Sequence, residues 1–264
     1  MPALTAILIS YNEEVDLPRA LASLAGVADE IVVVDSESTD RTCDIARSFG
    51  ARVVSRKLDN LGSQKNYAAS LASNDWILSL DSDEELSPEL RASILQWKQQ
   101  TPEAAGYKVS RLTNYIGGWI RHSGWYPEFI LRIYLRGRGK FIGVPHDAVK
   151  LDGNPPLAVL KGHLFHYTVR SFAEHKAKLD AFTTMAAEDM FENGRKSWRA
   201  AMIFAPPWTV MQRLVFQLGL LDGRRGWLIA WMSAKYIYVK YRKLGRLRAG
   251  ETLSHRSWPS PGSV

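Results

Sequence analysis

Cysteine is almost absent from this sequence, with Cys43 as the only one among 264 residues. A single thiol can form neither an intrachain disulfide framework nor a cysteine-based zinc site, so a reducing compartment, the cytoplasm, is favoured. Without cross-links the fold must depend on its core, and 46% apolar residues suffice for a sizeable one. The length indicates one main domain with an appendage rather than two equal domains.

Long hydrophobic runs are also missing, because no stretch approaches the roughly 18 apolar residues of a membrane-spanning helix. Proline, glutamine and charged residues interrupt the apolar segments near the C-terminus. The N-terminal MPALTAILISYNEE lacks the basic start and the cleavage site of a signal peptide, and we interpret it as a buried first strand. We therefore expect no part of the chain to cross a membrane.

Acidic residues are scarce between positions 195 and 250, where Asp222 is the only one beside twelve lysines and arginines. The whole chain carries +7, so this excess of eleven charges leaves −4 for the remainder. Large apolar side chains are mixed with the basic ones, which is typical of helices that lie in a membrane interface. The predicted partner is an anionic surface, either phospholipid headgroups or a phosphorylated acceptor. A solvated basic face, or packing against the main domain, is the alternative.

Short apolar runs alternate with helical patterns over the first hundred residues. Residues 31–34 are apolar at consecutive positions, as a strand covered on both faces requires. We predict an α/β fold with a Rossmann-like, mostly parallel sheet flanked by helices in residues 1–170. Residues 171–250 are predicted to form a basic, amphipathic helical appendage, and the Ser/Pro-rich residues 251–264 a flexible tail.

Acidic and polar residues follow three of the predicted strands, at positions 11–14, 35–40 and 81–85. In open α/β sheets the ligand binds beyond the carboxyl ends of the strands. Asp81 and Asp83 stand two apart, so a turn can direct both carboxylates at one divalent ion. Taken alone, an Asp-rich turn is more often a helix cap or a solvated loop. Neighbouring motifs must decide between these interpretations.

Four such motifs occur in order, ISYNEE, VVVDSESTDRT, QKNYA and WILSLDSDEELSPEL, and together they resemble the signature of family 2 glycosyltransferases with the GT-A fold. Further along, GGWIRHSGWYPEFILRIYLR, VPHDAV and LFHYTVRS are similar to the branch that contains lipopolysaccharide inner-core β-glucosyltransferases. The resemblance covers roughly residues 4–245. It implies an inverting, metal-dependent enzyme that moves a sugar, such as glucose, from a UDP-sugar to a lipid-linked oligosaccharide such as lipopolysaccharide core. Residues 1–100 would bind the nucleotide sugar and residues 101–170 the acceptor.

The resemblance assigns the nucleotide sugar to side chains at and near the polar clusters. Asp35 would accept the uracil N3 hydrogen, and its alternative role is to cap the following helix. Lys65 would support the uracil or the diphosphate, unless it is an ordinary exposed helix lysine. Asp81 would lie near the ribose. The remaining predicted contacts are Ser10, Asn12, Glu13 and Ser82.

The resemblance also implies a divalent metal, Mg or Mn, held by Asp83 with Asp81 and completed by His166. Neutral imidazole is a competent ligand for such an ion, although a lone histidine is more often structural.

Inverting transfer needs a base that takes the proton from the acceptor hydroxyl. Asp147, in the sequence PHD, aligns with the family's catalytic base, where this branch more often resembles His-Glu, and Glu128 is the competing candidate. Three aromatic residues could stack on the acceptor sugars or could belong to the core: Trp119, Trp125 and Tyr126.

Other acceptors are compatible with the same donor half, namely a polyprenyl phosphate or a protein side chain. A different class would be a non-catalytic carbohydrate- or membrane-binding module on a transferase fold, and the intact acidic residues argue against it. Nucleic acid is not an expected partner, because acidic strand ends repel phosphate unless a metal bridges them. We expect the protein to bind peripherally to the inner face of the cytoplasmic membrane, where a lipid-linked acceptor would be presented.

Overall fold

The computed structural model describes residues 1–142, 148–195 and 198–253. The chain divides into two compact units. Among the described residues, the first consists of Met1–Leu112 and Glu128–His166, and the second of Thr113–Pro127 together with the chain from Tyr167 to Leu253. The segment Thr113–Pro127 thus groups with the C-terminal helices, although in sequence it lies inside residues 1–170.

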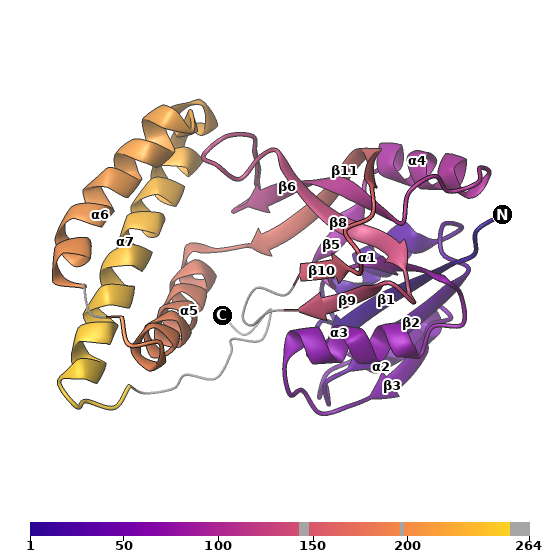
Figure 1. The fold of residues 1–264 in the computed structure, drawn as a ribbon, viewed down its shortest axis with the longest axis horizontal. Coiled ribbons are helices and arrows are strands. Elements are labelled where there is room, and N and C mark those ends of the chain that lie inside the picture. Colours follow the sequence, from indigo (N-terminus) through magenta and orange to yellow (C-terminus); the bar gives the residue numbers. More distant parts are fainter. Residues whose placement is uncertain (143–147, 196–197, 254–264) are drawn as a thin grey trace. The chain divides into compact units, whose positions relative to one another are not determined.

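Most strands of a nine-stranded mixed sheet belong to the first unit (Figure 1). Its strands, in sheet order, are β3 (Arg52–Ser55), β2 (Glu30–Asp35), β1 (Leu4–Ser10), β4 (Trp76–Ser79), β8 (Glu128–Leu135), β6 (Gly106–Tyr115), β11 (Leu157–Val169) and β5 (Glu84–Leu86), and β7 (Gly118–Ile120) pairs with β6. The first four are parallel, whereas β8 pairs antiparallel with both β4 and β6, and β5 pairs antiparallel with β11. A separate two-stranded sheet pairs β9 (Gly139–Ile142) antiparallel with β10 (Ala148–Leu151). The predicted α/β class with flanking helices is confirmed, and β1–β4 form a parallel part of the sheet.

The helices described in the first unit are α1 (Leu17–Leu24), α2 (Thr42–Ser48), α3 (Leu61–Ser70) and α4 (Pro88–Lys98), and local sequence signals set the starts of α3 and α4. The Ser87 hydroxyl accepts a hydrogen bond from the Leu90 backbone N–H at 3.1 Å, directly before a proline at the first helical position. The Asn60 side chain accepts from the Ser63 backbone N–H at 2.8 Å in the same way. Both residues satisfy a backbone donor that the helix leaves unpaired.

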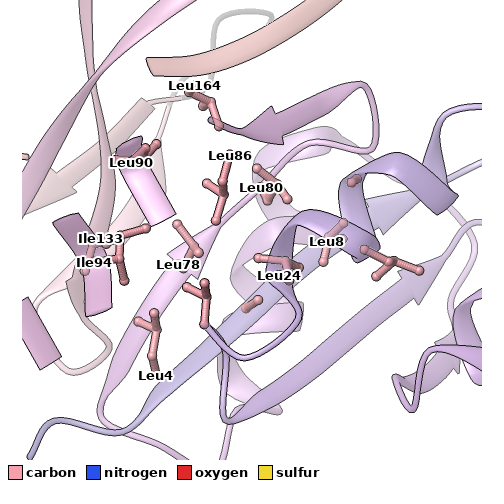
Figure 2. Close-up of a cluster of buried hydrophobic side chains, with 14 of the residues drawn as sticks. Leu4, Leu8, Leu24, Leu78, Leu80, Leu86, Leu90, Ile94, Ile133 and Leu164 are labelled. Atoms are coloured by element: carbon pink, nitrogen blue, oxygen red, sulfur yellow. The ribbon is translucent and has the colours of Figure 1, made fainter. Parts of the chain in front are cut away.

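The core lies on both faces of the sheet. Leu4 and Leu8 of β1 point into one buried cluster, together with residues of α1, α4, β4 and β5 (Figure 2). Ile7, between them, belongs to a second cluster with Val32 and Val34 of β2. Because alternate side chains of one strand enter different clusters, consecutive residues must be apolar, which explains the unbroken apolar runs in the sequence.

Helices dominate the second unit: α5 (Phe172–Glu192), α6 (Arg199–Met211), a π-helical turn η1 (Gln212–Phe216), a 3₁₀ turn η2 (Gly219–Asp222) and α7 (Gly223–Arg248). The start of α5 is capped in the same way, because the Ser171 hydroxyl accepts from the Glu174 backbone N–H at 3.1 Å. Helix α7 packs against both α5 and α6. The predicted C-terminal helical appendage is thereby confirmed. None of the helices within the described residues combines the length and the apolar content needed to cross a bilayer.

Candidate active site

The loops that follow β1 and β2 are joined by hydrogen bonds around Asp35. Its buried carboxylate accepts from the Ser10 hydroxyl at 3.0 Å and from the Ser38 backbone N–H at 2.8 Å. The Asn12 backbone N–H donates to the Ser38 hydroxyl at 2.8 Å, and the Asn12 side-chain oxygen accepts from the Thr39 backbone N–H at 2.8 Å. Asn12 has a φ of +55°, which non-glycine residues rarely adopt. Three of the predicted nucleotide contacts, Ser10, Asn12 and Asp35, are thus brought together.

The beginning of α2 closes this group. The Glu13 backbone N–H donates to the Thr42 hydroxyl at 2.7 Å, which places the fourth predicted contact beside the others. Asp35 is not the side-chain cap of α2, since its carboxylate accepts from residues of its own loop and from Ser10. Cys43 lies in the first turn of α2, where burial and then the negative charge of Asp35 raise the pKa of its thiol to about 11. The thiol is therefore protonated at neutral pH and is a poor nucleophile.

Asp81 is clamped between two cations. Its two carboxylate oxygens lie 2.8 Å from Lys65 Nζ and 2.8 Å from Arg132 Nη2. Lys65 is 8% exposed, with its ammonium 5.3 Å from the centre of the Phe141 ring, so it is not the ordinary exposed helix lysine. Burial alone would raise the pKa of Asp81, but the charges of Arg132 and Lys65 hold it well below its usual range. Asp81 is therefore a fixed carboxylate anion.

Arg132 joins Asp81 to a second, fully buried carboxylate. Its guanidinium donates to Glu84, whose side chain is 0% exposed. Burial raises the pKa of Glu84 above its ordinary value, although the positive charge of Arg132 opposes this. Burial would lower the pKa of Arg132, but the negative charges of Asp81 and Glu84 raise it overall. The network therefore keeps Arg132 charged inside the protein.

Glu128, one of the two predicted bases, is engaged by an arginine. Arg111 Nε and Nη2 donate to the two Glu128 oxygens at 2.8 and 2.9 Å, a bidentate pair across β6 and β8. The same guanidinium lies 3.9 Å from Glu84. Such a pair occupies both oxygens of the carboxylate. The other predicted base, Asp147, lies outside the described residues.

Asp83 faces His166, as both were predicted to hold a metal. Asp83 Oδ2 lies 3.4 Å from His166 Nε2, and the pairing of β5 with β11 places His166 opposite Glu84. Burial would lower the pKa of His166, but the charge of Asp83 and its hydrogen bond raise it overall. Within the described residues no cluster of three metal-type ligands occurs, and Asp81 is paired with Lys65 and Arg132.

The remaining pair nevertheless fits a divalent ion that is completed by its substrate. Magnesium commonly takes one or two protein carboxylates, keeps several waters and binds phosphate oxygens of the ligand, and neutral imidazole is a common metal ligand in proteins. Asp83 and His166 supply these donors. Ser82, between the two aspartates, donates its hydroxyl hydrogen to the Ile9 carbonyl at 2.8 Å and so ties this turn to the end of β1.

The predicted acceptor aromatics all belong to the second unit. Trp125 packs edge-on against Tyr115 with ring centroids 5.5 Å apart, within a small apolar cluster, as the core alternative expected. Trp119 is 38% exposed and meets Tyr167 edge-on at 5.6 Å. Tyr126 precedes a cis proline. Their contact with an acceptor stays a prediction.

Sequence reasoning missed Arg132, Glu84 and Arg111. A signal for the first of them was present, because Arg132 interrupts the apolar strand EFILRIYL. An arginine in a buried strand requires a buried counter-charge. The carboxylate that pairs with Arg132 is determined by the long-range pairing of β8 with β4 and β6, which the sequence does not reveal.

Residues 5–150 match the glycosyl transferase family 2. The chain belongs to this family. It is 29% identical over 272 residues to the lipopolysaccharide core biosynthesis glycosyltransferase LpsC of Rhizobium meliloti (strain 1021), covering 96% of this chain and 98% of LpsC. It is 28% identical to an uncharacterized glycosyltransferase of Rickettsia bellii (strain RML369-C), over 93% of this chain and 86% of that protein. The S. aureus TarS 1–349 structure in complex with UDP is similar with a TM-score of 0.48 and 17% identity, over 94% and 92% of the two chains.

Proposed function

We propose that this glycosyltransferase transfers a sugar from a UDP-sugar to a lipid-linked oligosaccharide of the lipopolysaccharide core type, with inversion of the configuration at the anomeric carbon. Glucose is the expected sugar. The observation that carries the donor half is the Ser82–Ile9 hydrogen bond, since it joins the Asp81–Asp83 turn to the Ser10–Asp35 loops at the carboxyl ends of the parallel strands. Parallel α/β sheets bind their ligands at this edge. The similarity to LpsC over nearly its whole length supports the acceptor class.

Each part of the donor half has a distinct task in this proposal. Asp35 and Asn12 hold the nucleoside through their fixed loops, and Asp81 stays anionic near the ribose because Lys65 and Arg132 surround it. Asp83 and His166 would hold a divalent ion, which supplies charge neutralisation for the leaving diphosphate.

The acceptor hydroxyl must lose a proton as it attacks. Glu128 is engaged by Arg111 through both oxygens, which favours Asp147 as the base. A carboxylate of ordinary basicity is sufficient for this step, because the proton is transferred as the new glycosidic bond forms.

A panel of nucleotide sugars, with and without EDTA and added Mg or Mn, tests the donor half. We expect hydrolysis of a UDP-sugar that stops with EDTA and returns with the metal. Turnover that ignores chelation would overturn the metal assignment, and no turnover with any donor would favour a binding module. An acceptor panel of core oligosaccharide lipid, polyprenyl phosphate and peptide then separates the acceptor classes.

The second unit supports a peripheral membrane location. Large apolar side chains of α6, η1, η2 and α7 are exposed, among them Phe204 (71%), Phe216 (65%), Leu221 (68%) and Trp231 (63%). Basic residues share these elements, a combination that favours an anionic lipid surface. Flotation with vesicles containing phosphatidylglycerol should carry the protein upward. Equal recovery at the bottom with and without vesicles would reject this part of the proposal.

A further inference from the structure

A cavity of about 420 Å³ lies inside the second unit, among α5, α6, η1 and α7. Helices α5, α6 and α7 are drawn in the orange-to-yellow part of Figure 1. The volume of the cavity falls in the range of pockets that hold small organic ligands. Most of its lining is hydrocarbon, contributed chiefly by Val169, Leu179, Phe182, Ile229, Met232 and Ile237. An apolar chain would therefore be favoured inside it.

Arg213 is one of the polar residues of this lining and has no anionic partner among the described residues. Its guanidinium donates to the Ser123 carbonyl at 2.6 Å and to the Gln217 side-chain oxygen at 3.0 Å, both of which are neutral. Burial lowers the pKa of Arg213, and no nearby carboxylate counteracts this. A partly buried guanidinium without a counter-ion is costly, and an anion would relieve that cost.

Lys178 and His175 also line the cavity, but neither adds an unmatched positive charge to it. Lys178 is already matched, because its ammonium lies 2.8 Å from Glu174 and donates to the Thr168 carbonyl at 2.6 Å. His175 Nδ1 is hydrogen-bonded to the Tyr115 hydroxyl at 2.6 Å. Burial, and after it the positive charge of Lys178, lowers the pKa of His175 to about 4. The histidine is neutral at pH 7, so one unmatched positive charge remains at the cavity.

We propose that this cavity binds an anionic phospholipid, with one acyl chain among the apolar side chains and the phosphate on Arg213. A guanidinium is well suited to phosphate oxygens because its donors are arranged as a fork. A lipid from a membrane could reach the cavity from the exposed surface of these helices. The lining residues Thr209 and Ser233 lie close in sequence to Trp208 and Trp231, which are 54% and 63% exposed. The inference rests on the proposed membrane association, since the membrane supplies the lipid.

Calorimetric titration of the full chain with dihexanoyl-phosphatidylglycerol, kept below its micelle concentration, tests the cavity without a bilayer. We expect binding at least about tenfold tighter than that of dihexanoyl-phosphatidylcholine, whose headgroup has no net charge. Glycerol phosphate alone should bind far more weakly, because it lacks the chain. Equal affinity for the two short-chain lipids, or binding of glycerol phosphate as tight as that of the lipid, would overturn the proposal.

Two variants locate the site. Arg213→Gln should weaken phosphatidylglycerol binding by about tenfold or more and remove the preference over phosphatidylcholine. Ser233→Phe should abolish binding of both lipids by filling the cavity. The matched control is Arg224→Gln, an exposed arginine of the same unit that does not line the cavity, and it should bind like the wild type. Wild-type binding in Ser233→Phe would overturn the proposal. If Arg213→Gln fails to fold, Arg213→Lys replaces it in the test, because it retains the positive charge but lacks the fork of donors.

The same proteins in vesicle flotation separate this inference from the proposed membrane association. If the wild type binds the short-chain lipid but does not float, the membrane location fails and the cavity stands. If it floats but does not bind the short-chain lipid, the cavity fails and the membrane location stands.

Discussion

Replacing Arg132 by methionine is expected to destabilise the first unit. The Arg132 side chain is 8% exposed, and it lies against Glu84, which is 0% exposed. Methionine fills part of the space without a charge, so Glu84 stays buried beside Asp81 with its nearest cation gone. Removing one partner of a buried ion pair typically costs about 3–5 kcal/mol. Lys65 still holds Asp81 at 2.8 Å and Arg111 remains 3.9 Å from Glu84, so we expect the lower end of that range.

Urea unfolding followed by circular dichroism measures this loss of free energy. The matched control is Arg47→Met, since Arg47 is 61% exposed and pairs at 3.2 Å with Asp44, which is 79% exposed. Exposed pairs contribute less than about 1 kcal/mol, so this variant should unfold nearly like the wild type. Equal losses for the two arginine variants would refute the buried network.

A second substitution and the pH dependence identify the cause of the loss. Glu84→Leu in the Arg132→Met background should recover more than half of the lost stability, because no buried carboxylate is left without a cation. Burial raises the pKa of Glu84 in the folded chain, and Arg132 opposes this rise. Without Arg132 the folded state binds the Glu84 proton more tightly than the unfolded state does. The deficit of Arg132→Met should therefore be smallest in acid and grow as the pH rises toward neutrality.

Four further outcomes follow from the site. Asp147→Asn should keep UDP binding in calorimetry and lose sugar transfer, whereas Glu128→Gln should keep most transfer; the opposite pattern would make Glu128 the base. Asp83→Asn should raise the metal concentration for half-maximal turnover by about tenfold or more, and an unchanged value would contradict its role as a ligand. Asp35→Ala should raise KM for the UDP-sugar more than it lowers kcat. Cys43 should react with iodoacetamide far more slowly than free cysteine, because its thiol pKa is about 11.

Much of the fold could be predicted because its signals are local. Ser87 before a proline marks the start of α4, and Ser171 marks that of α5. Consecutive apolar residues at 31–34 predicted a strand covered on both faces, and its side chains do enter different clusters. The order of the motifs predicted the family, which is confirmed. For the helix starts and the strand, the physical reason lies within a few residues of the signal.

The parts that could not be predicted depend on contacts between distant residues. The ion pairs of Arg132 with Asp81 and Glu84 join residues that are 51 and 48 positions apart. The grouping of Thr113–Pro127 with the C-terminal helices depends on packing across an even longer separation. No local pattern marks either feature, since an isolated arginine or a short hairpin has many possible partners.

Asp222 shows how far such a distant contact can change an interpretation. In the sequence it is only the single acid of a basic region, but in the structure its side chain is 4% exposed and accepts hydrogen bonds from the backbone N–H groups of Arg121 and His122 at 3.0 and 3.1 Å. It also accepts from the Ser123 hydroxyl at 2.8 Å. Two flanking residues, Leu220 and Leu221, are 52% and 68% exposed. The turn between Trp119 and Trp125 is thus fastened to the segment that would meet a lipid surface, so membrane binding and the placement of the predicted acceptor aromatics are expected to be mechanically linked.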